Sequence, residues 1–182
     1  KHKLSPAVDG VGDGKAFFNE AMRDFSQGPV RAAFGAAVSS CLVPRVTNET
    51  GVQAAGEMVA RAHGAFASWR DSDAMVRSAV LVKAAQIMRA RRDELSGVMI
   101  KEAGKTWREA DADTCEAIDF CEYYARQAAR LFDRQRIGRF IGELDEAVYQ
   151  PRGVAVVIAP WNFPLAICCG MTVAALVTGN PV

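Results

Sequence analysis

The residues best suited to polar chemistry lie near the end of the sequence, in the segment Ala159-Pro-Trp-Asn-Phe-Pro164. Asn162 stands between Pro160 and Pro164, whose rings restrict the backbone around it. A side-chain amide held in a restricted turn is a candidate hydrogen-bond donor to an oxygen that becomes negatively charged during a reaction. The alternative is that Asn162 only caps the helix that follows it. The residues alone leave both interpretations open.

Residue types that perform nucleophilic or metal chemistry are few or unfavourably placed. The chain has five cysteines, none at a spacing typical of metal ligands: Cys41, Cys115, Cys121, Cys168 and Cys169. Cys168 and Cys169 lie in an apolar stretch with no nearby base, so we expect them to be small core residues. Only His2 and His63 are present, and we therefore expect neither a histidine-based metal site nor a histidine triad.

Two apolar segments must position Asn162. Residues 154–159 are β-branched at four of their six positions, which suits a strand buried on both faces. Residues 165–177 are long enough for a helix, and Gly179 followed by Pro181 is a helix stop signal. Strand, turn and helix form the first half of a βαβ unit, in which ligands bind at the carboxyl end of the strand. That end is residues 158–162.

Apolar residues recur at helical spacing through the middle of the chain and predict four helices, over residues 52–69, 73–91, 92–103 and 106–132. Gly104, between Lys101 and Lys105, is expected to end the third in a left-handed conformation, and we interpret the lysines as dipole-complementing charges. In the second helix we expect one buried stripe: Val76, Val80, Ala84, Ile87 and Met88.

The flanking regions have weaker patterns. One or two short helices are expected within residues 17–37, and a short strand within residues 42–46. A change of period over residues 140–149 predicts a β-hairpin with its turn near residues 143–146. Residues 1–16 contain Pro6 and several glycines and are expected to be a linker or arm rather than a signal peptide.

Composition sets the broad class. With 182 residues, 50% of them hydrophobic and 24% charged, the chain resembles an ordinary globular protein of one or two domains. A net charge of +1 gives no indication of a nucleic-acid partner. An odd number of cysteines without a signal sequence favours a reduced, cytoplasmic protein. The longest apolar run, residues 165–177, is too short to span a bilayer.

Several motifs together resemble the aldehyde dehydrogenase superfamily. The hexapeptide at residues 159–164 carries the resemblance with the helix that follows it, which ends Ala174-Ala-Leu-Val-Thr-Gly-Asn180. Lys101-Glu-Ala-Gly-Lys-Thr-Trp107 is similar to one of the N-terminal helices of the superfamily. Asp111-Ala-Asp-Thr-Cys-Glu-Ala-Ile-Asp-Phe-Cys-Glu-Tyr-Tyr-Ala125 resembles the 1-pyrroline-5-carboxylate (L-glutamate γ-semialdehyde) dehydrogenases in particular.

This resemblance implies an α/β fold. Residues 17–182 would form the N-terminal part of the cofactor-binding domain, comprising N-terminal helices, the start of a Rossmann-like parallel sheet and a protruding β-hairpin. Residues 17–34 resemble the start of the dehydrogenase. The linker at residues 1–16 resembles the junction that joins it to proline dehydrogenase in the bifunctional proline utilisation A proteins.

The resemblance also implies roles for individual residues. Asn162 matches the side-chain donor of the oxyanion hole, and Ile158, Ala159, Pro160 and Trp161 match the wall that faces the nicotinamide end of NAD. Phe163 would line the aldehyde pocket and Glu116 would flank its entrance. The alternatives are strand-end packing for residues 158–161, a place in the core for Phe163 and a solvated helix carboxylate for Glu116.

The implied activity is NAD-dependent oxidation of L-glutamate γ-semialdehyde to L-glutamate in proline catabolism. The hairpin, at about residues 138–150, would mediate homo-oligomerisation, and a proline dehydrogenase domain would be a covalent partner. The nucleophilic cysteine and the general base of the family match no residue up to Val182, so the chain alone is expected to be inactive. Two alternatives are a non-catalytic helical interaction domain and an aldehyde dehydrogenase of another substrate class.

Overall fold

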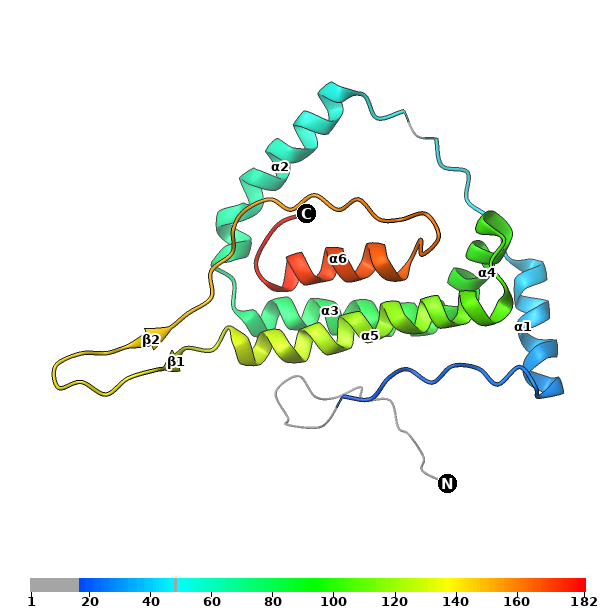
Figure 1. Ribbon diagram of the computed structural model, residues 1–182. Coiled ribbons are helices and arrows are strands. Elements are labelled where there is room, and N and C mark those ends of the chain that lie inside the picture. The colour runs from blue at the N-terminus through cyan, green and yellow to red at the C-terminus, as the bar shows by residue number, and fades with distance from the viewer. Residues whose placement is uncertain (1–16, 48) are drawn as a thin grey trace.

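Helices dominate the computed structural model, which describes residues 17–47 and 49–182 (Figure 1). The elements in chain order are α1 Gly28–Ser40, α2 Val52–Arg70, α3 Ala74–Ala90, α4 Arg92–Ala103, α5 Trp107–Leu131, β1 Gln135–Arg136, β2 Glu146–Ala147 and α6 Ala166–Val177. The five helices predicted over residues 52–177 are thus confirmed, with bounds close to those expected. The linker expected at residues 1–16 lies outside the described residues.

Helix α5 is the centre of the fold, with α3 and α6 packed along it (Figure 1). Thr106 caps its first turn and Glu109 completes a reciprocal capping box, so these two residues determine where the helix begins. The core between these three helices consists of Leu81, Ala85, Ile118, Cys121, Ala125, Ala128, Val173 and Val177. Its many small side chains allow the helix axes to approach closely, while each large aliphatic residue contributes about 1.5–3 kcal/mol by burial.

Residues 17–24 are not helical, so the prediction of helices within residues 17–37 was correct only for α1. This segment runs past α5 and is bound to it by charged groups (Figure 1). Asp119 accepts a hydrogen bond from the Glu20 amide at 2.7 Å, and Arg89 pairs with the Glu20 carboxylate at 2.7 Å. These tertiary bonds compete with the local helical pattern. The short strand expected within residues 42–46 is also absent from the structure.

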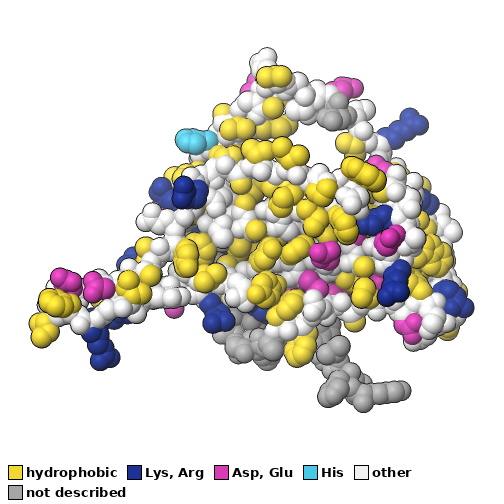
Figure 2. All heavy atoms as spheres, viewed as in Figure 1, with side chains coloured by type: hydrophobic (Ala, Val, Ile, Leu, Met, Phe, Trp, Pro, Cys, Tyr) yellow, Lys and Arg dark blue, Asp and Glu magenta, His cyan; other side chains and the backbone are white. Residues whose placement is uncertain are grey.

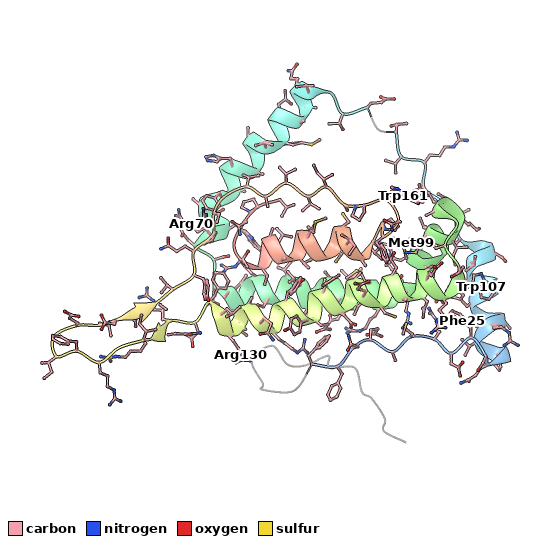
Figure 3. All side chains as sticks on the ribbon, in the orientation of Figure 1. Phe25, Arg70, Met99, Trp107, Arg130 and Trp161 are labelled. Carbon is pink, nitrogen blue, oxygen red and sulfur yellow. The ribbon has the colours of Figure 1, made fainter. Side chains whose placement is uncertain are left out.

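An aromatic cluster closes the α1 end of the molecule. Phe25 and Trp107, both labelled in Figure 3, have ring centroids 6.0 Å apart, and Phe34 packs edge-on against Trp107 at 5.3 Å. Pro29 lies in the first turn of α1, where its missing amide hydrogen is not needed. The cluster therefore holds α1 against the beginning of α5.

The predicted buried face of α3 was wrong for its valines and for Ile87, whereas Ala84 and Met88 are half-buried and pack against the core. Val76, Val80 and Ile87 are 55%, 47% and 47% exposed. The helix instead buries Arg77, Ser78, Leu81 and Ala85. The polar members of this set have partners, because Arg77 donates to the Val177 carbonyl and Ser78 to the Ala125 carbonyl. Apolar residues lie almost all round α3, so periodicity could not select the face.

Apolar side chains also remain uncovered elsewhere. Helix α2 has no buried residue, and Val52, Met58 and Val59 on it are exposed. Figure 2 shows hydrophobic side chains gathered over the face that carries α2 and α6. No helix among the described residues is both long enough and apolar enough to cross a membrane.

Residues 154–159 lie in no regular strand, and the expectation that they are buried on both faces was wrong. Val156 is 74% and Ile158 is 85% exposed, whereas their neighbours are half-buried. The physical reason is that no other strand lies beside them in the described chain, where the only sheet pairs β1 with β2. The segment crosses over α6 before its turn (Figure 1).

The predicted β-hairpin is present and protrudes from the helices (Figure 1). Its strands are antiparallel, with Arg136 opposite Glu146. The turn lies earlier than predicted, around Gly142, whose φ of 89° suits a glycine, and Glu146 belongs to β2 instead. Apolar side chains between the strands are exposed, including Ile141 at 100% and Phe140 at 68%.

Candidate functional site

The segment that carries Asn162 is fixed at its beginning to the end of α6. The side-chain oxygen of Asn180 accepts hydrogen bonds from the amides of Arg152 at 2.7 Å and Gly153 at 3.0 Å. Gly179, between α6 and Asn180, has φ 86°, and a Cβ there would lie 2.6 Å from Pro151. The glycine predicted as a helix stop is therefore also required for this close approach.

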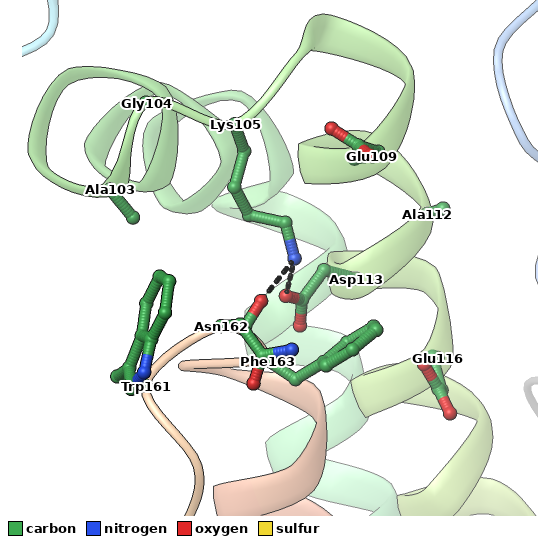
Figure 4. A pocket seen from close by; sticks show the side chains of 10 residues that line it. All are labelled: Ala103, Gly104, Lys105, Glu109, Ala112, Asp113, Glu116, Trp161, Asn162 and Phe163. Atoms are coloured by element: carbon green, nitrogen blue, oxygen red, sulfur yellow. Dashed lines mark hydrogen bonds and ion pairs between the residues drawn. The ribbon is translucent and has the colours of Figure 1, made fainter.

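The far end of the segment is fixed by a buried ion pair. Lys105 Nζ lies 2.5 Å from Asp113 Oδ2 and donates a hydrogen bond to the Asn162 carbonyl at 3.1 Å (Figure 4). Asp113 Oδ1 accepts a hydrogen bond from the Ala166 amide at 2.6 Å. Together, Lys105 and Asp113 connect the turn and the beginning of α6 to helix α5.

The local sequence determines where Lys105 stands. Gly104 ends α4 in the left-handed conformation, with φ 67°, and Thr106 is already the N-cap of α5. Lys105 is the single residue between these two caps, so its backbone has little freedom. Its side chain is 10% exposed and that of Asp113 is fully buried.

A cavity of about 360 Å³ lies between the turn, the end of α4 and the beginning of α5 (Figure 4). Four of the residues singled out in the sequence line it: Glu116, Trp161, Asn162 and Phe163. Lys105 and Asp113 line it as well. Residues 158–160 do not, because they lie before the turn on the extended segment. The structure thus brings together residues from α5 and from the turn that are 45 or more positions apart in sequence.

The Asn162 side chain is exposed and has no hydrogen-bond partner within residues 17–47 and 49–182. Leu165 is the N-cap residue of α6 and supplies no side-chain cap, whereas Asp113 bonds the first amide of the helix. The helix-capping interpretation of Asn162 therefore does not describe this structure. Its amide is free to bind another group.

Phe163 points from the turn toward helix α5, which carries Glu116, and both residues line the cavity (Figure 4). Phe163 is 42% exposed, with Lys105 Nζ 4.6 Å from its ring centroid, so it is not a core phenylalanine. Glu116 is an exposed carboxylate on α5. Trp161, at 83% exposure, stands on the other side of Asn162.

No cysteine of the described residues lines the cavity at Asn162. Burial raises the pKa of Cys115 to about 12. A hydrogen bond with Cys169, at an Sγ–Sγ distance of 3.7 Å, and burial both raise the pKa of Cys121. Cys168 is exposed rather than a core residue as expected, and it lies outside the cavity. None of these thiols combines a lowered pKa with a place at Asn162.

Lys105 and Asp113 were not identified from the sequence. Lys105 was interpreted as a helix-end charge, because a lysine beside a glycine stop often has that role. The available signal was Asp113, a carboxylate on a face of α5 that also carries Ala110 and Ala117, both fully buried. A charge on a buried face needs a partner of opposite charge, and Lys105, just before the N-cap residue Thr106, is such a residue.

Comparison with known proteins adds independent information. The sequence model of the aldehyde dehydrogenase family matches residues 41–182. The 1-pyrroline-5-carboxylate dehydrogenase of Anoxybacillus flavithermus is 54% identical over 121 residues, which are 66% of this chain and 24% of that enzyme. The enzyme of the same name from Bacillus mycoides is 51% identical over 121 residues. The chain spans about a quarter of the length of these curated relatives.

Solved structures agree with the sequence relatives. Proline utilization A from Bdellovibrio bacteriovorus, inactivated by N-propargylglycine, superposes with a TM-score of 0.82 at 33% identity, over 92% of this chain and 21% of that one. A 1-pyrroline-5-carboxylate dehydrogenase from Thermus with bound NAD gives a TM-score of 0.81 at 35% identity, over 91% of this chain and 39% of that one. The helices, the hairpin and the unpaired segment 154–159 thus correspond to an incomplete α/β fold.

Proposed function

Because the chain belongs to the aldehyde dehydrogenase family, we propose that it forms the N-terminal part of an NAD-dependent L-glutamate γ-semialdehyde dehydrogenase. The proposed reaction oxidises the semialdehyde to L-glutamate in proline catabolism. One observation carries the proposal: the free amide of Asn162 stands at a cavity, on a turn held from both ends. The names of the relatives at 51–54% identity support this substrate.

Asn162 is the proposed oxyanion donor. Attack of a thiolate on the aldehyde carbon converts the carbonyl oxygen to an alkoxide, and a preorganised N–H group stabilises that charge. A donor of this type contributes about 3–4 kcal/mol to lowering the barrier. The amide fits the role because it is unpaired within the described chain and because the turn is anchored by Asn180 and Lys105.

The cofactor is proposed to contact residues 158–161. Ile158 and Trp161 expose apolar side chains, at 85% and 83%, and Trp161 lines the cavity; such a surface suits the flat nicotinamide end of NAD. Ala159 and Pro160 supply the backbone between them. When bound, NAD accepts the hydride that leaves the aldehyde carbon. The residues of this chain would orient that end of the cofactor and shield it from water.

Phe163 and Glu116 are proposed to contact the aldehyde. Both line the cavity that Asn162 faces, one as an apolar wall and the other as a carboxylate at the opening. Their separation in sequence means that substrate would contact both the turn and helix α5. This arrangement supports binding of a short chain with polar groups at one end.

The organisation of the longer protein is also proposed. The hairpin over residues 135–147 would mediate homo-oligomerisation in the cytoplasm, since its tip exposes apolar side chains. Residues 1–16 would be the linker to a preceding proline dehydrogenase domain. The nucleophile and the general base would come from further chain, because no cysteine of the described residues lines the cavity at Asn162.

An assay of the full-length protein with L-glutamate γ-semialdehyde and NAD tests the function. Turnover with this aldehyde, exceeding that with acetaldehyde and succinate semialdehyde, is the expected result. A protein that binds NAD in calorimetry but prefers another aldehyde would redirect the substrate assignment. A protein that neither binds NAD nor oxidises any aldehyde would contradict the function and favour a non-catalytic interaction domain. The isolated 182-residue chain should be inert.

A further inference from the structure

The ion pair of Lys105 and Asp113 makes contacts that a simple helix-end charge does not require. Lys105 Nζ contacts the Asp113 carboxylate, the Asn162 carbonyl and the Phe163 ring. Asp113 also bonds the amide that begins α6, directly after the turn. These contacts fix the main chain at Asn162 itself and at the beginning of α6, on either side of Phe163.

We propose that Lys105 and Asp113 are positioning residues that hold the Asn162 amide in its catalytic geometry. The inference rests on the proposed function, because it assigns the pair to the reaction at Asn162. Neither residue is assigned as an oxyanion donor: the Asp113 carboxylate has no hydrogen to donate, and the Lys105 ammonium contacts Asp113, the Asn162 carbonyl and the Phe163 ring. They act by setting where the turn lies.

Burial explains why the pair is suited to this role. The Asp113 side chain is fully buried and that of Lys105 is 10% exposed, so the attraction between them is little screened. An exposed lysine would exchange partners with water, whereas this one has fixed partners on three sides. The turn, in contrast, is exposed from Pro160 to Pro164. Without the pair, the remaining hydrogen bonds hold only the beginning of the segment: Arg152 and Gly153 donate to Asn180, and the Ala155 amide donates to the Pro181 carbonyl.

Replacing Lys105 alone affects stability as well as the position of the turn, because its partner Asp113 is buried. Lys105→Met leaves the Asp113 carboxylate buried without its countercharge and should destabilise the protein. The double variant Lys105→Met/Asp113→Asn removes both charges and retains an amide oxygen to accept from Ala166. We expect the double variant to recover the thermal stability lost by Lys105→Met, but not the lost turnover.

The kinetic test uses the full-length dehydrogenase. In the double variant kcat should fall roughly 10–100-fold, as a small misplacement of a catalytic group does. The KM for NAD should change less than kcat, because the pair is proposed to act on Asn162 and not on residues 158–161. Lys101→Met is the matched control: Lys101 also donates to main-chain carbonyls, those of Ser39 and Cys41, but it does not line the cavity. It should retain wild-type kcat.

Repeating the kinetic test in a protein that lacks the Asn162 side chain distinguishes positioning of that side chain from a general structural effect. In an Asn162→Ala protein, the double variant should lower kcat no further, because the group being positioned is already absent. An equal fall in both backgrounds would overturn the inference, as would recovery of kcat together with stability. Failure of the wild-type protein to oxidise aldehydes would instead overturn the proposed function.

Discussion

The carboxylate of Asp113, on helix α5, accepts a hydrogen bond from the main-chain amide of Ala166, the first residue of helix α6, at 2.6 Å. One helix therefore caps another, in place of a side chain from the residues just before α6. An anionic group at a helix N-terminus also interacts favourably with the helix dipole. The same carboxylate pairs with Lys105, so stability and site geometry depend on one buried group.

Replacing Asp113 should therefore lower stability strongly. Asp113→Ala leaves Lys105 without its partner and α6 without its cap, and should reduce the free energy of unfolding by about 3–5 kcal/mol. Asp113→Asn should reduce it less, because the amide oxygen can still accept from Ala166. Urea unfolding followed by circular dichroism measures both. The surface variant Glu57→Ala should change the free energy by less than about 0.5 kcal/mol. Equal losses for Ala and Asn would contradict the capping role.

Asp111 should make stability depend on pH. Burial raises the pKa of this carboxyl, but hydrogen bonds from Arg92 and from the Arg23 amide outweigh burial and lower it overall. Because the pKa of Asp111 is lower in the folded state than in the unfolded state, its ionised carboxylate stabilises the fold. This stabilisation is fully present above the unfolded-state pKa of about 3.9, and it is lost as the pH falls through the folded-state pKa.

The measurement compares wild type with Asp111→Asn. The wild type should be more stable at pH 7, by about 3 kcal/mol for a buried pair, and the difference should shrink below about pH 4. Denaturant titrations at pH 7, 5, 4 and 3 would show this. A difference that stays constant, or that grows as the solution becomes more acidic, would mean that Asp111 does not carry the stabilising charge.

The hairpin should control self-association. Ile141 is fully exposed at its tip, so Ile141→Asp should weaken an apolar contact between copies without disturbing the core. Sedimentation velocity of the full-length protein should then show a smaller assembly than wild type. Glu143→Gln, in the same turn, alters charge but keeps the apolar side chains and should assemble normally. An unchanged assembly for Ile141→Asp would exclude the hairpin as the main contact.

The cysteines beside the turn should be dispensable for catalysis. Cys168 and Cys169 lie on α6, outside the cavity, and loss of a true nucleophile would abolish turnover. Cys168→Ala and Cys169→Ala should each keep kcat within about threefold of wild type, since they remove only a small side chain. Loss of burst and steady-state activity in either variant would show that the nucleophile lies in this chain after all.

The sequence predicted most of the helices because their ends carry local signals. Gly104 and Gly179 each act within a few residues and were predicted as helix stops, and both have a positive φ in the structure. Asn162 was likewise identified because two prolines mark its turn. Signals of this kind fix where elements begin and end.

What could not be predicted depends on contacts between distant residues. The non-helical segment around Glu20 is held by Arg89 and Asp119, which are 69 and 99 positions away. The face of α3 is selected by how α5 packs, not by the valines at Val76 and Val80. The hydrogen bond from Lys105 to the Asn162 carbonyl spans 57 positions, a stretch that contains α5 and the hairpin. Periodicity carries no information about such distances.

The central claim is that this chain supplies the oxyanion donor of an aldehyde dehydrogenase. Steady-state kcat of full-length Asn162→Ala with L-glutamate γ-semialdehyde and NAD tests it most directly. The account predicts a fall of about 10²–10³-fold relative to wild type, because one preorganised donor is lost. A variant that folds as stably as wild type and turns over at the wild-type rate would contradict it.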